Sequence, residues 1–290
     1  MLGTLLKYDF KALNKMMVPL QLGVLVAGII GVVCFNIFLR GALNSPSYSS
    51  KDSTQVLLES IGEGSALLVA IVLFSVVFVS GIITLVLLAR NIYKNFYSNE
   101  GYLTFTLPVT VNQQLLSKTI SGFVWLLVNG CIVTLIVVLL VVFGTATEGF
   151  IGTQALQILE NLFSNYAPAL LILFVIELVI TSLLSFIMSI TQIIFSISLG
   201  GAIARTHKVL AGIGIYVAGG AIISTVASVL LVLVQIGISM FDSNHYSYYS
   251  NPGFADAQPT IIISIVCTII FSLVFFLVSK NSLKKNLNLD

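Results

Sequence analysis

The strongest candidate for chemistry in this sequence is an acidic side chain inside a long apolar segment. Glu177 is the only ionisable residue deep in such a segment. A charge at the centre of a membrane-spanning helix costs about 2.5–3.5 kcal/mol, so we expect the carboxyl group to be protonated, paired or facing a cavity. Small and polar residues follow at spacings of three or four, on one broad helical face: Thr181, Ser185, Ser189, Gln192, Ser196 and Gly200.

Two interpretations of this polar stripe stay open. In the functional one, a substrate pathway is lined by Glu177, Thr181, Ser185, Ser189 and Gln192. In the structural one, these groups hydrogen-bond to neighbouring helices, and Asn129 is a possible partner for Glu177. The segment 168–200 would be about 50 Å long as one helix, more than the bilayer core needs. We therefore expect it to project into the cytoplasm or to break near 189–192.

The residues that usually bind metals or nucleotides form no recognisable pattern. Cys34, Cys131 and Cys267 lie apart in apolar runs, and His207 and His245 are solitary, so no zinc site or disulfide framework is expected. The phosphate-loop pattern G-x-x-x-x-G-K-[ST] is missing from the sequence. We expect a chain that is not itself an enzyme and holds no cofactor; any ATP and Mg²⁺ would be bound by a partner subunit.

The composition indicates that lipid, rather than water, surrounds most of the chain. Of the 290 residues, 58% are hydrophobic and only 8% are charged, against roughly 25% charged in a soluble domain. So few charges could not cover the surface of a soluble protein of this size. The composition excludes a cytosolic enzyme, a disordered protein and a nucleic-acid binder with a basic face.

Six segments are long enough to cross a hydrocarbon core, which takes about 20 helical residues. They are 17–39, 66–89, 120–143, 167–190, 209–240 and 260–279. With both termini cytoplasmic, every Lys and Arg except Arg40 and Lys51 lies on the inner side, as the positive-inside rule requires. We predict an all-α polytopic membrane protein, a single transmembrane domain over 1–290.

The N-terminal residues 4–16 predict a further helix in the inner interface. Leu6, Phe10 and Leu13 form its apolar side, and a neighbouring stripe of lysines at i, i+4 and i+8 suits anionic headgroups: Lys7, Lys11 and Lys15. This segment is either an elbow helix that meets a partner and moves with the first span, or a simple membrane anchor.

The inner loop between the second and third spans, 90–118, is rich in aromatic residues. Glu100-Gly101 predicts a turn, and Pro108 ends any helix before it. Exposed Tyr, Phe and Leu side chains here suit docking of a soluble partner. An aromatic belt at the membrane interface is the alternative.

The order of these elements resembles the ABC-2 type permease family, the membrane subunits of ATP-driven exporters. The resemblance rests on the start Leu5-Leu6-Lys7-Tyr8-Asp9-Phe10, the six spans, and Gly101-Tyr-Leu-Thr-Phe-Thr-Leu-Pro108 after the second span. It implies the ABC-2 exporter fold and a dimer with a second copy or a different permease. It also implies a separate ABC ATPase subunit and a bacterial cell-membrane location.

The resemblance further implies two contacts with that ATPase. A coupling helix would include Asn99, Glu100, Tyr102, Leu103, Phe105 and Leu107. A second contact at 198–208 would include Arg205, His207 and Lys208. The expected function is outward transport of an amphipathic or hydrophobic substrate such as a peptide, drug or lipid. An ion-gradient-driven secondary transporter and a non-transport membrane scaffold or sensor are the alternatives, and the cargo is not identified by the sequence.

Overall fold

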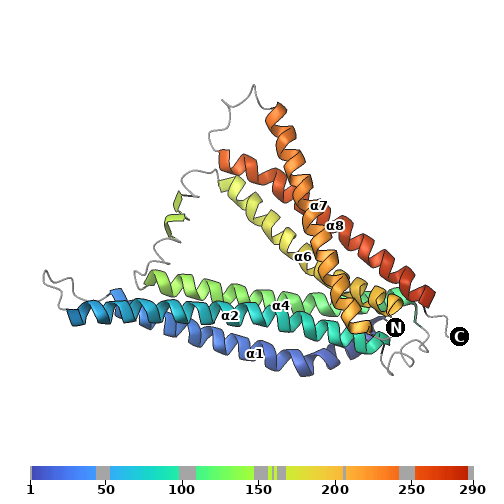
Figure 1. Ribbon diagram of the computed structural model, residues 1–290, viewed down its shortest axis with the longest axis horizontal. Coiled ribbons are helices and arrows are strands. Elements are labelled where there is room, and N and C mark those ends of the chain that lie inside the picture. Colours follow the sequence, from blue (N-terminus) through green and yellow to red (C-terminus); the bar gives the residue numbers. More distant parts are fainter. Residues whose placement is uncertain are drawn as a thin grey trace. The chain divides into compact units, whose positions relative to one another are not determined.

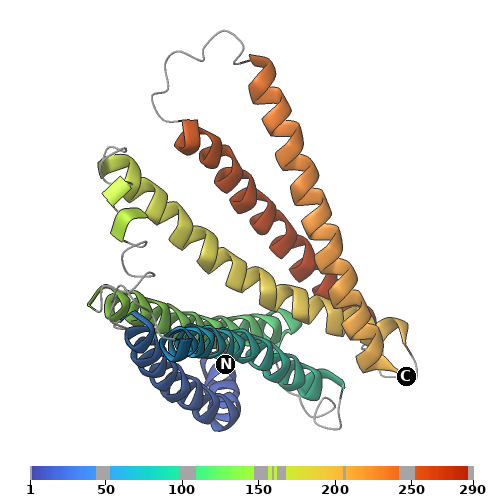
Figure 2. The same ribbon diagram turned by 60° about the vertical axis from the view of Figure 1, so that its left-hand side comes forward.

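The computed structural model describes residues 2–43, 53–97, 109–146, 156–158, 160–161, 168–204, 207–241 and 252–286. Long α-helices make up nearly all of this part of the chain (Figures 1 and 2). They are α1 (Leu2–Leu43), α2 (Ser53–Tyr97), α4 (Val111–Ala146), α6 (Pro168–Ile203), α7 (Lys208–Phe241) and α8 (Pro252–Asn286). Within the described residues, all six are long and apolar enough to cross a membrane, which supports the predicted multi-pass character.

The helices extend beyond the predicted spans, above all around the inner loop between the second and third spans. Residues 90–97 belong to α2, and α4 begins at Val111, so both ends of the predicted loop are helical. A capping box starts α4: the Gln113 backbone N–H donates to Thr110 Oγ1 at 3.4 Å, and the Thr110 N–H donates to Gln113 Oε1 at 3.3 Å. These bonds satisfy donors that a helix start leaves unpaired.

The N-terminal segment 4–16 is helical, as predicted, but it is continuous with the first span through Pro19. Leu13 and Met17 are buried, whereas the three lysines are exposed. A distinct elbow helix is therefore not delimited within α1, and its separate role stays a prediction.

Helix α6 runs unbroken from Pro168 to Ile203. Of the two alternatives for this long segment, the break near 189–192 is therefore absent, and projection beyond the bilayer core stays a prediction. The hydroxyl groups of α6 explain how a serine-rich stretch stays helical. Thr181 Oγ1 donates to the Glu177 carbonyl at 2.8 Å, and Ser189 Oγ donates to the Ser185 carbonyl at 2.8 Å. Such bonds satisfy the side chain within its own helix without interrupting the backbone ladder.

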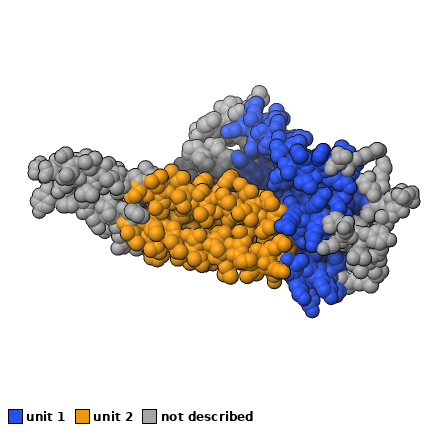
Figure 3. Space-filling view, turned by 60° about the horizontal axis from the view of Figure 1, so that its bottom comes forward, with its two compact units in different colours: residues 1–12, 88–124, 165–290 blue, residues 13–87, 125–164 orange. Residues whose placement is uncertain are grey.

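The chain divides into two compact units (Figure 3). Unit 2 comprises Leu13–Leu87 and Trp125–Ser164. Its apolar core is Val24, Val32, Leu73 and Ile136. Two glycines let the helices approach: a Cβ at Gly28 would overlap Ile136, and one at Gly31 would lie 3.1 Å from Leu73.

Unit 2 also contains a polar centre that joins three helices. Gln21 Nε2 donates to Thr84 Oγ1 at 3.3 Å, and Asn129 Nδ2 donates to Gln21 Oε1 at 3.2 Å. All three residues are buried. Each amide or hydroxyl group meets a partner from another helix, which removes the cost of placing it in an apolar surrounding.

Unit 1 comprises Met1–Ala12, Leu88–Val124 and Asn165–Asp290. Here α6 packs against both α7 and α8, and the three helices converge toward the end where α6 stops and α7 begins (Figures 1 and 2). At that point a Cβ on Gly200 would lie 2.6 Å from the backbone nitrogen of Gly212. Phe195 and Phe275 stack there with centroids 4.5 Å apart.

The part of unit 1 that holds Lys7, Lys94, Lys118, Lys208 and Lys284 is called the lysine-rich end below.

Candidate functional site

Tyr97, the last residue of α2, joins the C-terminal helices at the lysine-rich end. Its hydroxyl group donates to the Ser198 carbonyl of α6 at 3.0 Å. Ser282 Oγ of α8 donates to the same carbonyl at 3.3 Å. One backbone oxygen of α6 therefore accepts bonds from two other helices.

The ring of Tyr97 makes further contacts with the start of α7 and the end of α6. Lys208 Nζ lies 5.7 Å from the ring centroid, within cation–π range. A Cβ on Gly201 would overlap the ring, so only glycine leaves room for it there. Tyr93, one turn earlier, stacks on Tyr97 with centroids 5.9 Å apart. Tyr97 thus connects α2 to α6 and α7 directly, and to α8 through Ser198.

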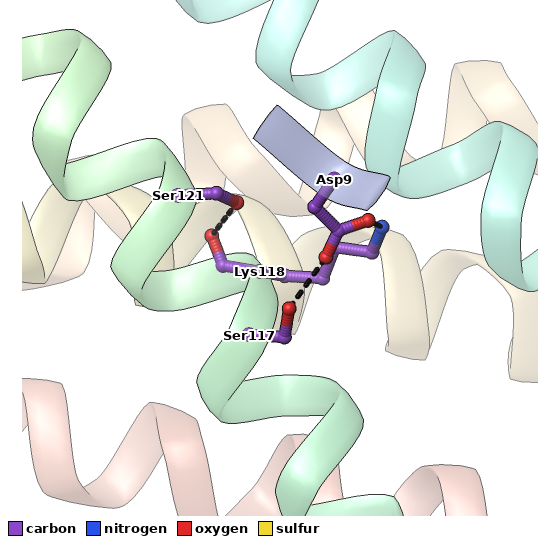
Figure 4. Close-up of polar contacts among 4 residues, drawn as sticks. All are labelled: Asp9, Ser117, Lys118 and Ser121. Atoms are coloured by element: carbon purple, nitrogen blue, oxygen red, sulfur yellow. Dashed lines mark hydrogen bonds and ion pairs between the residues drawn. The ribbon is translucent and has the colours of Figure 1, made fainter. Parts of the chain in front are cut away.

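A second polar cluster joins α1 to α4 (Figure 4). Lys118 forms an ion pair with Asp9, and Ser117 Oγ donates to Asp9 Oδ2 at 2.6 Å. The Lys118 carbonyl accepts a bond from Ser121 Oγ at 3.2 Å. Asp9 is 6% exposed and Lys118 4%. Burial of either charge alone would be costly, and the pair with its added hydroxyl bond offsets that cost.

These two clusters flank the segment 98–108. Tyr97 precedes it directly. The capping box at Thr110–Gln113 and the Ser117–Lys118 contacts with Asp9 follow it. Both flanks lie in unit 1. The contacts here are non-covalent: Tyr97 joins the end of α2 to α6, and Lys118 joins α4 to α1.

The residues predicted to line a pathway differ in their surroundings. Glu177, Thr181 and Ser189 are half-buried, and Ser185 is exposed. Gln192 is buried, and its Nε2 donates to the Tyr216 carbonyl of α7 at 3.0 Å. The Gln192 end of the stripe therefore packs α6 against α7, while the four residues from Glu177 to Ser189 lie on a less buried part of α6.

Most of the predicted ATPase contacts lie outside the described residues: Asn99, Glu100, Tyr102, Leu103, Phe105, Leu107 and Arg205. His207 is described and exposed, and its carbonyl accepts the Ala211 N–H at 3.1 Å in the first turn of α7. Lys208 meets Tyr97. Both ends of the predicted second contact, Ser198 and Lys208, therefore meet Tyr97, which lies two residues before the predicted first contact begins at Asn99.

Asp9 and Tyr97 are the residues that sequence reasoning missed. Asp9 is the only acid before position 52, and it lies on the helical face opposite the lysines. This position is the signal from which a buried partner could have been predicted. Nothing in the sequence distinguishes Tyr97 from the other aromatic residues nearby, because its contacts are with distant segments.

Comparison with known proteins leaves the family open. No family model matches the sequence, and neither a curated protein nor a solved structure matches it. Within the described residues, no three His, Cys, Asp or Glu side chains gather as metal ligands would.

Proposed function

We propose that the chain is the transmembrane permease subunit of an ATP-driven ABC-2 type exporter that moves an amphipathic or hydrophobic substrate outward. The observation that carries this proposal is the anchoring of both flanks of 98–108, at Tyr97 and at Lys118. The segment between them holds the aromatic stretch that resembles the coupling helix of that family.

In this proposal a separate ATPase subunit binds ATP and Mg²⁺. The same subunit contacts four residues of the segment: Tyr102, Leu103, Phe105 and Leu107. Closure of the ATPase displaces the segment 98–108, and the bond from Tyr97 to the Ser198 carbonyl transmits this displacement to α6. Because α6 is an unbroken helix packed against α7 and α8, the movement reorients all three. Glu177, Thr181, Ser185 and Ser189 then line the substrate pathway, and a second permease completes it in the cell membrane, with both termini cytoplasmic.

The decisive experiment is purification of the tagged protein in mild detergent from its native host, scored for a co-purifying ATPase and for ATP hydrolysis. We expect a stoichiometric ATPase, and we expect Tyr102→Asp and Leu103→Asp to abolish its binding, because a buried carboxylate in an apolar contact is costly. The matched control is Thr104→Asp, which adds the same carboxylate at the next position in the sequence. A well-folded protein that never retains an ATPase, and that carries out gradient-driven flux alone, would instead favour a secondary transporter.

Tyr97→Phe separates docking from transmission. The variant keeps the ring over Gly201 and beside Lys208, and loses only the bond to the Ser198 carbonyl. That bond contributes about 0.5–1.5 kcal/mol, so we expect normal ATPase binding with export reduced severalfold. Tyr93→Phe is the control, because it preserves the Tyr97 hydroxyl. Equal export by the two variants would remove Tyr97 from the transmission route.

A further inference from the structure

One face of α1 changes from apolar residues to lysines along its length. Its exposed residues include Val18, Leu22, Val26, Ile29, Val33 and Ile37. Lys7, Lys11 and Lys15 are exposed as well. At 100° per residue, all nine fall within an arc of about 120°. The lysines therefore continue the same face that the apolar residues present to lipid.

The length of the apolar part matches one bilayer core. Val18 to Ile37 spans 20 residues, about 30 Å of helix, which is the thickness of the hydrocarbon region. Lys15 then lies about 5 Å and Lys11 about 10 Å beyond the hydrocarbon boundary, at the depth of the headgroups. Lys7 lies one turn further out.

The acid in this segment is withdrawn from that face. Asp9 is buried on the opposite side of the helix, where Lys118 pairs with it and Ser117 donates to it. Among the described residues 2–37, the exposed charges are therefore the three lysines alone. Tyr8, 68% exposed, lies on the same arc, and tyrosine is typical of the interface between lipid and water.

We infer that Lys7, Lys11 and Lys15 bind the headgroup of an anionic phospholipid whose acyl chains lie along Val18–Ile37. A lipid fits this arrangement because its anionic headgroup complements the lysines while its acyl chains continue along the apolar residues of the same face. The site is independent of the proposed export function.

Site-directed quenching tests this lipid site. Cys34, Cys131 and Cys267 are replaced by Ala, and Val18→Cys carries a bimane label. The protein is reconstituted in phosphatidylcholine vesicles containing one-fifth phosphatidylglycerol, with bromine on the chains of one lipid at a time. We expect brominated phosphatidylglycerol to quench beyond its mole fraction at low salt, with each lysine contributing up to about fivefold enrichment. High salt should reduce the excess.

Variants identify the groups responsible. The triple change Lys7→Gln, Lys11→Gln and Lys15→Gln should return quenching to the mole fraction, and the corresponding triple change to Arg should preserve the excess. Lys15→Gln alone should lower it more than Lys7→Gln, and serves if the triple variant folds poorly. A label at Leu233→Cys on α7, 58% exposed, provides the control site.

Quenching at the mole fraction in the protein with native lysines would overturn the inference, as would an excess that survives the triple change to Gln. Loss of ATPase binding in the triple variant, with lipid quenching unchanged, would assign the lysines to an acidic protein surface instead.

Discussion

The first three helices and the last three are held together by different means. Side chains join α1, α2 and α4 at several depths: Asp9 meets Lys118 within unit 1, and Gln21 meets Thr84 and Asn129 within unit 2. Within unit 2, the apolar core of Val24, Val32, Leu73 and Ile136 adds contacts beyond the Gln21 group.

Helices α6, α7 and α8 meet near one end, where Phe195 stacks on Phe275 and the other contacts involve backbone atoms. Gly200 approaches Gly212, Gln192 bonds the Tyr216 carbonyl, and Ser282 bonds the Ser198 carbonyl. Away from this end, no residue of α6 between 171 and 189 is buried. The two groups therefore differ in where their stability resides: along the helices in the first, at one end in the second.

This difference shows which group is suited to move. A helix fixed near one end by close backbone packing can change its tilt there without losing contacts along its whole length, whereas a helix with paired polar groups at several depths cannot. The convergence of α6, α7 and α8 beside Tyr97 places the pivot next to the predicted docking segment.

The largest expected effect comes from breaking the charge pair of the first group. Lys118→Met leaves the Asp9 carboxylate buried without its counter-charge, and removal of one partner of a buried pair costs about 3–5 kcal/mol. The measurement is the free energy of unfolding in mixed micelles titrated with SDS.

The double variant Asp9→Asn with Lys118→Met is the control for this prediction. It removes both charges and retains a hydrogen-bonding group for Ser117, so most of the lost stability should return. If the double variant is as unstable as Lys118→Met alone, the cost arises from lost packing by the lysine stem and not from an uncompensated carboxylate.

A smaller effect is expected where the second group depends on backbone approach. Gly200→Ala would place a Cβ 2.6 Å from the Gly212 nitrogen and 2.7 Å from its Cα, so the two helices must separate. Overpacking of this kind costs about 1–3 kcal/mol.

Gly214→Ala is the matched control for Gly200→Ala, because a Cβ at Gly214 would meet nothing within 4 Å. It should be neutral or slightly stabilising, since alanine favours the helix. Thermal unfolding of both variants in detergent distinguishes them, and equal midpoints would show that the α6–α7 contact adds little stability.

Hydropathy was sufficient to predict the six helices, because a run of 20 apolar residues has few alternatives in lipid. It did not predict their ends. Residues 90–97 are polar and aromatic, so they resemble a loop, yet α2 continues through them to Tyr97. The start of α4 was readable: Thr110 followed by Gln113 is a capping-box pattern.

The candidate site was less accessible to sequence reasoning. Glu177 is conspicuous in the sequence because a carboxyl group in an apolar run is rare. That its helix, α6, is in contact with Tyr97 is known only from the fold. Asn129 shows the same limit: the sequence suggests it as a possible partner for Glu177, and the hydrogen bond that its amide donates goes to Gln21. Polarity indicates that a buried group has a partner, while the identity of the partner depends on packing.

The smallest expected effect compares one buried amide from each group. Gln21→Leu removes a side chain that bonds two other helices and leaves the Asn129 amide without its acceptor, whereas Gln192→Leu removes a single bond to a backbone carbonyl. Interhelical hydrogen bonds in membranes average about 0.6 kcal/mol and reach about 1.7 kcal/mol. Gln21→Leu should therefore cost about 1–2 kcal/mol and Gln192→Leu about half of that, measured by SDS titration. If Gln192→Leu proved the more costly, the last three helices would depend on side-chain bonding as much as the first three, and the pivot beside Tyr97 would lose its physical basis.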